Sequence, residues 1–97
     1  MSSGSYHGSL KERLIPNNIA TATTTLVKTG VGFLGHIVVN GGTMGSITVY
    51  DGIDATGTAI ATVASPSAGM VLPYGCVFNV GLCIVTAAAT NITVCYV

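Results

Sequence analysis

Charged side chains are scarce in this 97-residue sequence: they make up 6% of it, against about 25% in a typical soluble domain. Three are basic and three are acidic, so the net charge is zero, and residues 29–97 contain neither lysine nor arginine. Nucleic-acid binding requires clustered cations that neutralise phosphates. We therefore exclude nucleic acid as a partner.

So little charge is also unusual for a freely diffusing monomer, which stays soluble through scattered surface charge. A chain of 97 residues builds one domain at most, with a small core. Two interpretations of the surface stay open. It is either a neutral surface of Thr, Ser, Asn and Gly, or a surface that contacts other subunits. The small core and the low charge favour the second.

Long apolar runs are absent. A membrane-spanning helix needs about 20 consecutive apolar residues, whereas the longest candidate, residues 80–89, is interrupted by Gly81 and Thr86. The first residues are rich in Ser and Gly and contain no signal peptide. The sequence therefore predicts a protein that is made in the cytoplasm and has no membrane partner.

Cysteine spacing excludes two further classes of protein. Cys76, Cys83 and Cys95 form no C-x-x-C pair, which excludes a standard zinc motif and a redox dithiol. Two interpretations stay open. The thiols are either buried and reduced, acting as small hydrophobes, or they form a disulfide within or between subunits in an oxidising medium.

Catalytic motifs are lacking as well. The candidate acids and bases are Glu12, Asp51, Asp54, His7 and His36. None belongs to a nucleophile elbow, an H-E-x-x-H motif or a phosphate-binding loop. Residues 51–57 lack the spacing and the terminal glutamate of an EF-hand, and we interpret them as a turn. We expect no enzyme activity and no catalytic, cofactor-binding or metal site.

Thr, Val and Ile are abundant from residue 21 onward, and these β-branched residues favour strands. Short runs of them alternate with turn residues at roughly 8–12-residue intervals. The expected strands are 23–28, 33–39, 46–50, 59–64, 76–79, 82–86 and 91–97, with a hairpin turn at 40–45 and a bend at 73–75. The pattern predicts an all-β fold: a small antiparallel β-sandwich of about seven strands, jelly-roll-like or immunoglobulin-like.

Residues 1–20 are interpreted as an extended N-terminal arm and residues 21–97 as the sandwich domain. Ser9 and Glu12 are placed to cap one short helical turn, which Pro16 would end. Two interpretations of the arm stay open, a disordered tail and a segment that clips onto a neighbouring subunit.

Three expected strands, at 37–39, 82–85 and 94–97, are apolar on both faces. A two-layer sandwich covers one face of each sheet, so a second apolar face needs another cover. A neighbouring subunit would supply it, although a closed barrel core or partial exposure would also explain the pattern. The expected subunit contacts are Leu10, Arg13, Leu14, Ile15, Cys83, Val85, Cys95 and Val97.

Five runs, 40–52, 55–63, 72–75, 81–86 and 89–94, resemble small virion proteins of tailed bacteriophages. The resemblance covers about residues 21–97. It implies a capsid decoration (cement) protein of the virion that needs no cofactor. Its partners would be the major capsid protein and copies of itself, as a homo-oligomer with a trimer favoured. A tail, neck or connector component is the alternative. A carbohydrate- or host-surface-binding module is the second, against which the absence of tryptophan weighs.

Overall fold

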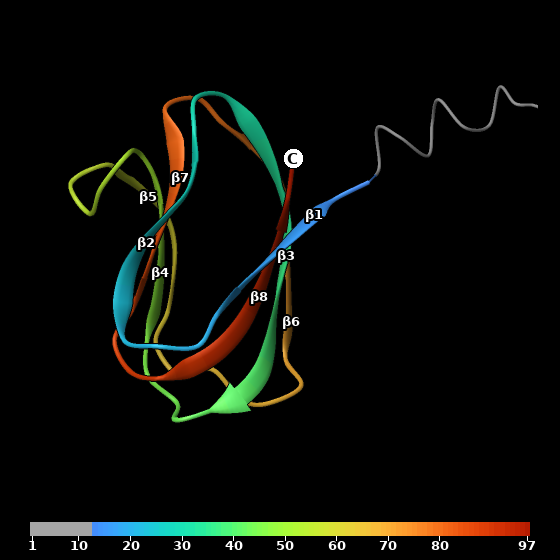
Figure 1. Cartoon of the computed structure of the whole chain (residues 1–97), viewed down its shortest axis with the longest axis vertical. Coiled ribbons are helices and arrows are strands. Elements are labelled where there is room, and N and C mark those ends of the chain that lie inside the picture. Colours follow the sequence, from blue (N-terminus) through green and yellow to red (C-terminus); the bar gives the residue numbers. More distant parts are fainter. Residues whose placement is uncertain (1–12) are drawn as a thin grey trace, which may run out of the picture.

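The structure, a computed structural model, describes residues 13–97. Eight strands form two four-stranded sheets that pack face to face (Figure 1). The strands are β1 (Ile15–Ile19), β2 (Thr23–Thr29), β3 (Gly32–Gly42), β4 (Ile47–Asp51), β5 (Thr58–Val63), β6 (Val71–Phe78), β7 (Gly81–Thr86) and β8 (Thr90–Tyr96). Within residues 13–97 no helix is long and apolar enough to cross a membrane.

The strand order defines a jelly roll. One sheet, called the β8 sheet below, has the order β1-β8-β3-β6, and the other, the β7 sheet, has the order β2-β7-β4-β5. All the pairings are antiparallel. Every connection except that between β4 and β5 crosses from one sheet to the other, and eight strands in this order make the double Greek key of a jelly roll. The predicted small antiparallel β-sandwich is therefore confirmed, and of the two architectures considered it is the jelly roll.

The core lies between the two sheets and follows from the alternation of side chains along each strand. On β4, Ile47 and Val49 point inward and are fully buried. On β3, Leu34 and Ile37 both point inward although they are three positions apart in the sequence, because the register shifts between Leu34 and His36. This β-bulge places an extra residue on the outer face of the strand.

Strand β1 lies within residues 1–20, which the sequence analysis assigned to an arm. It pairs along its whole length with β8, from Ile15 opposite Tyr96 to Ile19 opposite Ile92. Pro16 is compatible with this pairing because β1 is an edge strand, where a missing N–H need not break the ladder. The sandwich therefore begins near residue 15. The helical turn expected from Ser9 falls mainly outside the described residues.

Two expected turns are wrong. Residues 40–45 do not form a hairpin, because β3 continues to Gly42 and the chain then crosses to β4 in the other sheet. The bend expected at residues 73–75 lies inside β6, where Gly75 takes a φ of 60° without ending the strand. In both places glycine permits a positive φ, and the chain uses it to bend a strand instead of reversing it.

Candidate functional site

The candidate functional residues of this protein lie on its surface and not in a cavity. Residues 13–97 contain no pocket and no group of three or more His, Cys, Asp or Glu side chains able to hold a metal ion. What remains are the outer faces of the two sheets and the three thiols, which are all free. We describe the two faces in turn.

A row of four side chains crosses the outer face of the β8 sheet. Pro16 on β1 lies opposite Cys95 on β8, Cys95 lies opposite His36 on β3, and His36 lies opposite Pro73 on β6. Directly opposed residues of an antiparallel pair point to the same face, with Cβ atoms about 4.5–5.5 Å apart. Cys95 and His36 are both partly exposed. The row therefore places a thiol beside an imidazole on the surface.

Leu14, just before β1, packs on the outer face of the β8 sheet of its own chain, next to the row of four side chains. A Cβ on Gly35 would collide with Leu14 Cδ1 and would also lie 3.1 Å from the carbonyl oxygen of Cys95. Gly35 is the extra residue of the β3 bulge, so its missing side chain makes room for Leu14. We expected Leu14 to anchor the chain to a neighbouring subunit. In the structure it contacts its own domain and is partly buried.

One end of the same face is apolar. Phe33 lies opposite Val77 on β6. On its other side, its N–H donates to the Val97 carbonyl at 2.9 Å and its carbonyl accepts from the Val97 N–H at 2.8 Å. These side chains remain 39%, 58% and 37% exposed, respectively. A contiguous exposed apolar row of this kind marks an interaction surface more often than single exposed residues do.

The other end of the face carries amides. The Asn91 side-chain oxygen accepts hydrogen bonds from the amide groups of Asn18, at 2.7 Å, and Asn40, at 3.2 Å. Asn18 also donates to the Ile92 carbonyl and Asn40 to the Thr93 hydroxyl, at 2.8 and 2.9 Å. These bonds connect β1, β8 and β3 side to side. The outer face of the β8 sheet thus runs from apolar to amide side chains, and the rows described contain no charged group other than His36 when it is protonated.

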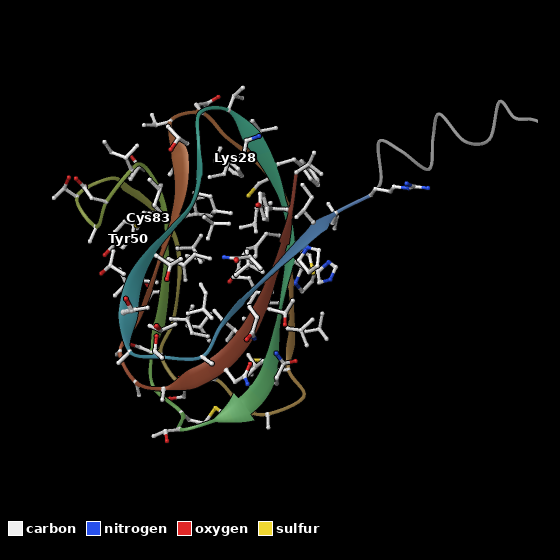
Figure 2. All side chains as sticks on the ribbon, viewed as in Figure 1. Lys28, Tyr50 and Cys83 are labelled. Atoms are coloured by element: carbon white, nitrogen blue, oxygen red, sulfur yellow. The ribbon has the colours of Figure 1, made fainter. Side chains whose placement is uncertain are left out.

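The outer face of the β7 sheet holds a concealed thiol. Cys83 on β7 lies opposite Leu26 on β2 and Tyr50 on β4, and it has no exposed surface. Figure 2 shows Cys83 and Tyr50 side by side, next to the β4–β5 loop (residues 52–57). Burial raises the pKa of the Cys83 thiol, and the negative charge of Asp54 in that loop raises it further. This thiol is therefore protonated and unreactive near neutral pH.

The β4–β5 loop is held together by its own residues. Asp54 accepts hydrogen bonds from the backbone N–H of Thr56, at 2.9 Å, and from the hydroxyl of the same residue. Gly52 and Gly57 meet closely enough that a Cβ on Gly52 would lie 2.8 Å from Gly57 Cα. The segment is a tight turn, as its sequence predicted. Its carboxylates are occupied by hydrogen-bond donors of the chain itself.

Asp51 binds a distant turn, which the sequence did not indicate. Its carboxylate accepts backbone N–H bonds from Asn79 at 2.9 Å, Val80 at 2.8 Å and Gly81 at 3.3 Å. The Gly52 N–H adds a bond of 3.0 Å to the Gly81 carbonyl. The carboxylate therefore anchors the β6–β7 turn, which joins the two sheets, to the end of β4.

We expect Asp51→Asn to lower the melting temperature by several degrees, because a neutral amide oxygen is a weaker acceptor than a carboxylate. The bonds from Asn79 and Val80 hold the pKa of Asp51 below its ordinary value of 3.8. A lowered folded-state pKa adds stability above pH 3.8, and this stability is lost as the pH falls through the lower value. Melting curves from pH 7 to pH 2 should show a steeper acid loss in the wild type than in Asp51→Asn.

Asp54→Asn is the matched control for this prediction. It removes bonds only within the turn, and the pKa of Asp54 is also lowered, first by the Thr56 hydroxyl. We expect a smaller fall in melting temperature than for Asp51→Asn. Equal effects of the two substitutions would show that Asp51 does not anchor the β6–β7 turn.

The expected contact residues do not form one surface. Cys83 and Val85 belong to the β7 sheet, and Cys95 and Val97 belong to the β8 sheet, on the opposite side of the sandwich (Figure 1). Arg13 and Ile15 are exposed at the start of β1, and Leu10 lies outside the described residues. The sequence analysis missed His36, Phe33 and Val77 as surface neighbours, because only the register of β3 with β6 and β8 brings them together.

Comparison with known proteins gives one structural likeness. No family model matches the sequence, and no curated protein matches it either. A solved structure described as "Bacillus endospore appendages form a novel family of disulfide-linked pili" matches with a TM-score of 0.57 and 21% sequence identity. The match covers 87% of this chain and 84% of the other. At this identity the likeness establishes a shared fold.

This finding corrects the function expected from the sequence. The resemblance to phage virion proteins rested on a pattern of turns and strands that many small β-sandwiches share. The solved structure that matches nearly the whole chain belongs to a pilus and not to a capsid. Capsid decoration is therefore wrong as the expected function of this chain.

Proposed function

We propose that this chain is a non-enzymatic structural subunit that assembles with copies of itself into a pilus-like fibre. The observation that carries the proposal is the likeness to the Bacillus appendage pili, which extends over 87% of this chain and 84% of the other.

The surface chemistry supports self-association. Only six side chains of the chain are charged, and they cancel, so copies can approach without net repulsion. Large apolar side chains remain exposed on both sheets, among them Leu26 at 46% and Val77 at 58%. In a small domain, such exposure is typical of a surface that a partner covers.

Sheet edges offer a second means of association. Strands β2 and β5 are the edges of the β7 sheet, and neither contains proline. Each leaves a row of unpaired N–H and C=O groups that a strand of another copy can extend. The edges of the β8 sheet, β1 and β6, contain Pro16 and Pro73, which makes them poorer edges for pairing.

Electron microscopy of the purified full chain tests the proposal. We expect filaments whose amount rises above a threshold concentration, and sedimentation that shows the loss of monomer over the same range. The experiment is done in reductant, so that non-covalent assembly is measured by itself. A chain that stays monomeric at every concentration, with and without reductant, would contradict the proposal.

A further inference from the structure

The three thiols of the chain have different surroundings. Cys83 has no exposed surface, and Cys76 packs inward against the core. Cys95 is partly exposed, and the residues on either side of it along β8, Val94 and Tyr96, are the ones that pack into the core. Of the three thiols, Cys95 is therefore the one that lies on an outer face and is also exposed there. Since the sequence holds only three cysteines, any reaction with a thiol of another molecule falls first to Cys95.

His36 supplies a proton acceptor beside this thiol. The two residues are directly opposed on neighbouring strands, a position in which Cβ atoms lie about 4.5–5.5 Å apart and side chains interact. The other side chains facing the pair are Pro16 from β1, Pro73 from β6 and Leu14, none of which titrates. A neutral imidazole accepts a proton near pH 7, and the thiolate, not the thiol, is the nucleophile.

From this geometry we propose that Cys95, with His36 as its base, is the site at which two copies of this chain become joined by a disulfide. The inference rests on the proposed self-assembly and names the residues of its covalent link. His36 takes the proton from the Cys95 thiol. The thiolate attacks a low-molecular-weight disulfide, forming a mixed disulfide and releasing one thiolate. Cys95 of the second copy then attacks the mixed disulfide and releases the other. Two protein thiols and one small disulfide thus give one protein disulfide and two small thiols.

The occupant of this face is a second copy for two reasons. A two-fold interface places a residue near the axis against the same residue of the partner, so a single outward thiol can meet itself. The face also carries no fixed charge in the rows around Cys95, so two identical faces do not repel.

The first experiment tests whether His36 acts as the base for Cys95, by comparing alkylation rates. We expect iodoacetamide to alkylate Cys95 of the folded chain at pH 7 about five- to tenfold more slowly in His36→Gln than in the wild type. At pH 10 the two rates should be equal, because hydroxide in the solvent then serves as the base in place of His36. Val38→Thr, on the same face of β3, is the control and should match the wild type at both pH values. Equal rates for His36→Gln and wild type at pH 7 would overturn the role of His36.

The second experiment tests whether a disulfide joins two copies of the chain and identifies the cysteine that forms it. The full chain is incubated with oxidised glutathione and analysed on non-reducing gels and by mass spectrometry. We expect a linked dimer joined through Cys95, lost in Cys95→Ser and kept in Cys76→Ala and in Cys83→Ala. Cys95 carrying only glutathione, or a link through another cysteine, would overturn the proposal. Filaments formed in reductant by Cys95→Ser would leave the proposed fibre intact, so failure of the link and failure of the fibre can be told apart.

Discussion

Phe78→Ala is expected to remove a large share of the free energy of unfolding of this domain. Phe78 has no exposed surface and is the largest fully buried side chain. It fills the core beneath β3, where a Cβ on Gly32 would collide with its ring. Truncating a buried Phe to Ala costs about 3–5 kcal/mol, and small domains have only about 5–15 kcal/mol in total. Urea titration followed by circular dichroism measures the loss.

Phe33→Ala is the matched control, because the chain contains only two phenylalanines and they differ in direction. Phe33 lies next to Gly32, the residue paired with Phe78, but it points to the outer face and is 39% exposed. Surface substitutions of this kind change stability by about 0.5 kcal/mol or somewhat more. If the two substitutions destabilised the domain equally, the inward packing of Phe78 would be wrong.

The parts of the fold that could be predicted depend on local pattern. Along residues 46–50 apolar and polar side chains alternate, and the structure buries Ile47 and Val49 while Thr48 and Tyr50 face outward. A strand with one buried and one wet face leaves this period of two in the sequence. The expected strands overlap seven of the eight strands of the sandwich, although β6 begins at Val71, five residues before the start expected for it.

The parts that could not be predicted depend on contacts between distant residues. Strand β1 begins Ile-Pro-Asn-Asn, a turn-like sequence, and it becomes a strand because β8 pairs with it. Glycines at 41 and 42 favour a turn, but turn chemistry does not tell whether the next strand joins the same sheet. The neighbours His36 and Cys95 are far apart in sequence, so only the register of β3 with β8 reveals the pair.

The strands that are apolar on both faces were the basis for expecting a neighbouring subunit, and β7 shows why the inference needed a structure. Cys83 on the outer face of β7 has no exposed surface within a single chain. Its cover is therefore the chain itself, namely Leu26, Tyr50 and the nearby β4–β5 loop with Asp54. The outer face of β8 differs, since Val97 remains 37% exposed there. The burial of Cys83 therefore needs no partner, whereas the exposed Val97 leaves the outer face of β8 available to one.

The second prediction with a large expected effect concerns how fast a thiol reagent modifies the buried Cys83. A Cβ on Gly57 would lie 2.7 Å from the Asp51 carbonyl oxygen and 2.8 Å from Gly52 Cα. Both atoms belong to the backbone, so a side chain at position 57 must open the β4–β5 loop. We expect Gly57→Val to raise the rate at which a thiol reagent modifies Cys83 by about tenfold or more, because opening both exposes the sulfur and removes the charge of Asp54.

Mass spectrometry after timed alkylation measures this rate, with Cys83 identified by its peptide. Ala55→Val is the control, since Ala55 is exposed in the same loop and a larger side chain there meets solvent. It should leave Cys83 as slow as in the wild type. A folded Gly57→Val protein in which Cys83 stays unreactive would mean that Tyr50 and Leu26 cover the thiol without the loop. Fast reaction in Gly57→Val alone would show that a single turn decides whether this second thiol takes part in cross-linking.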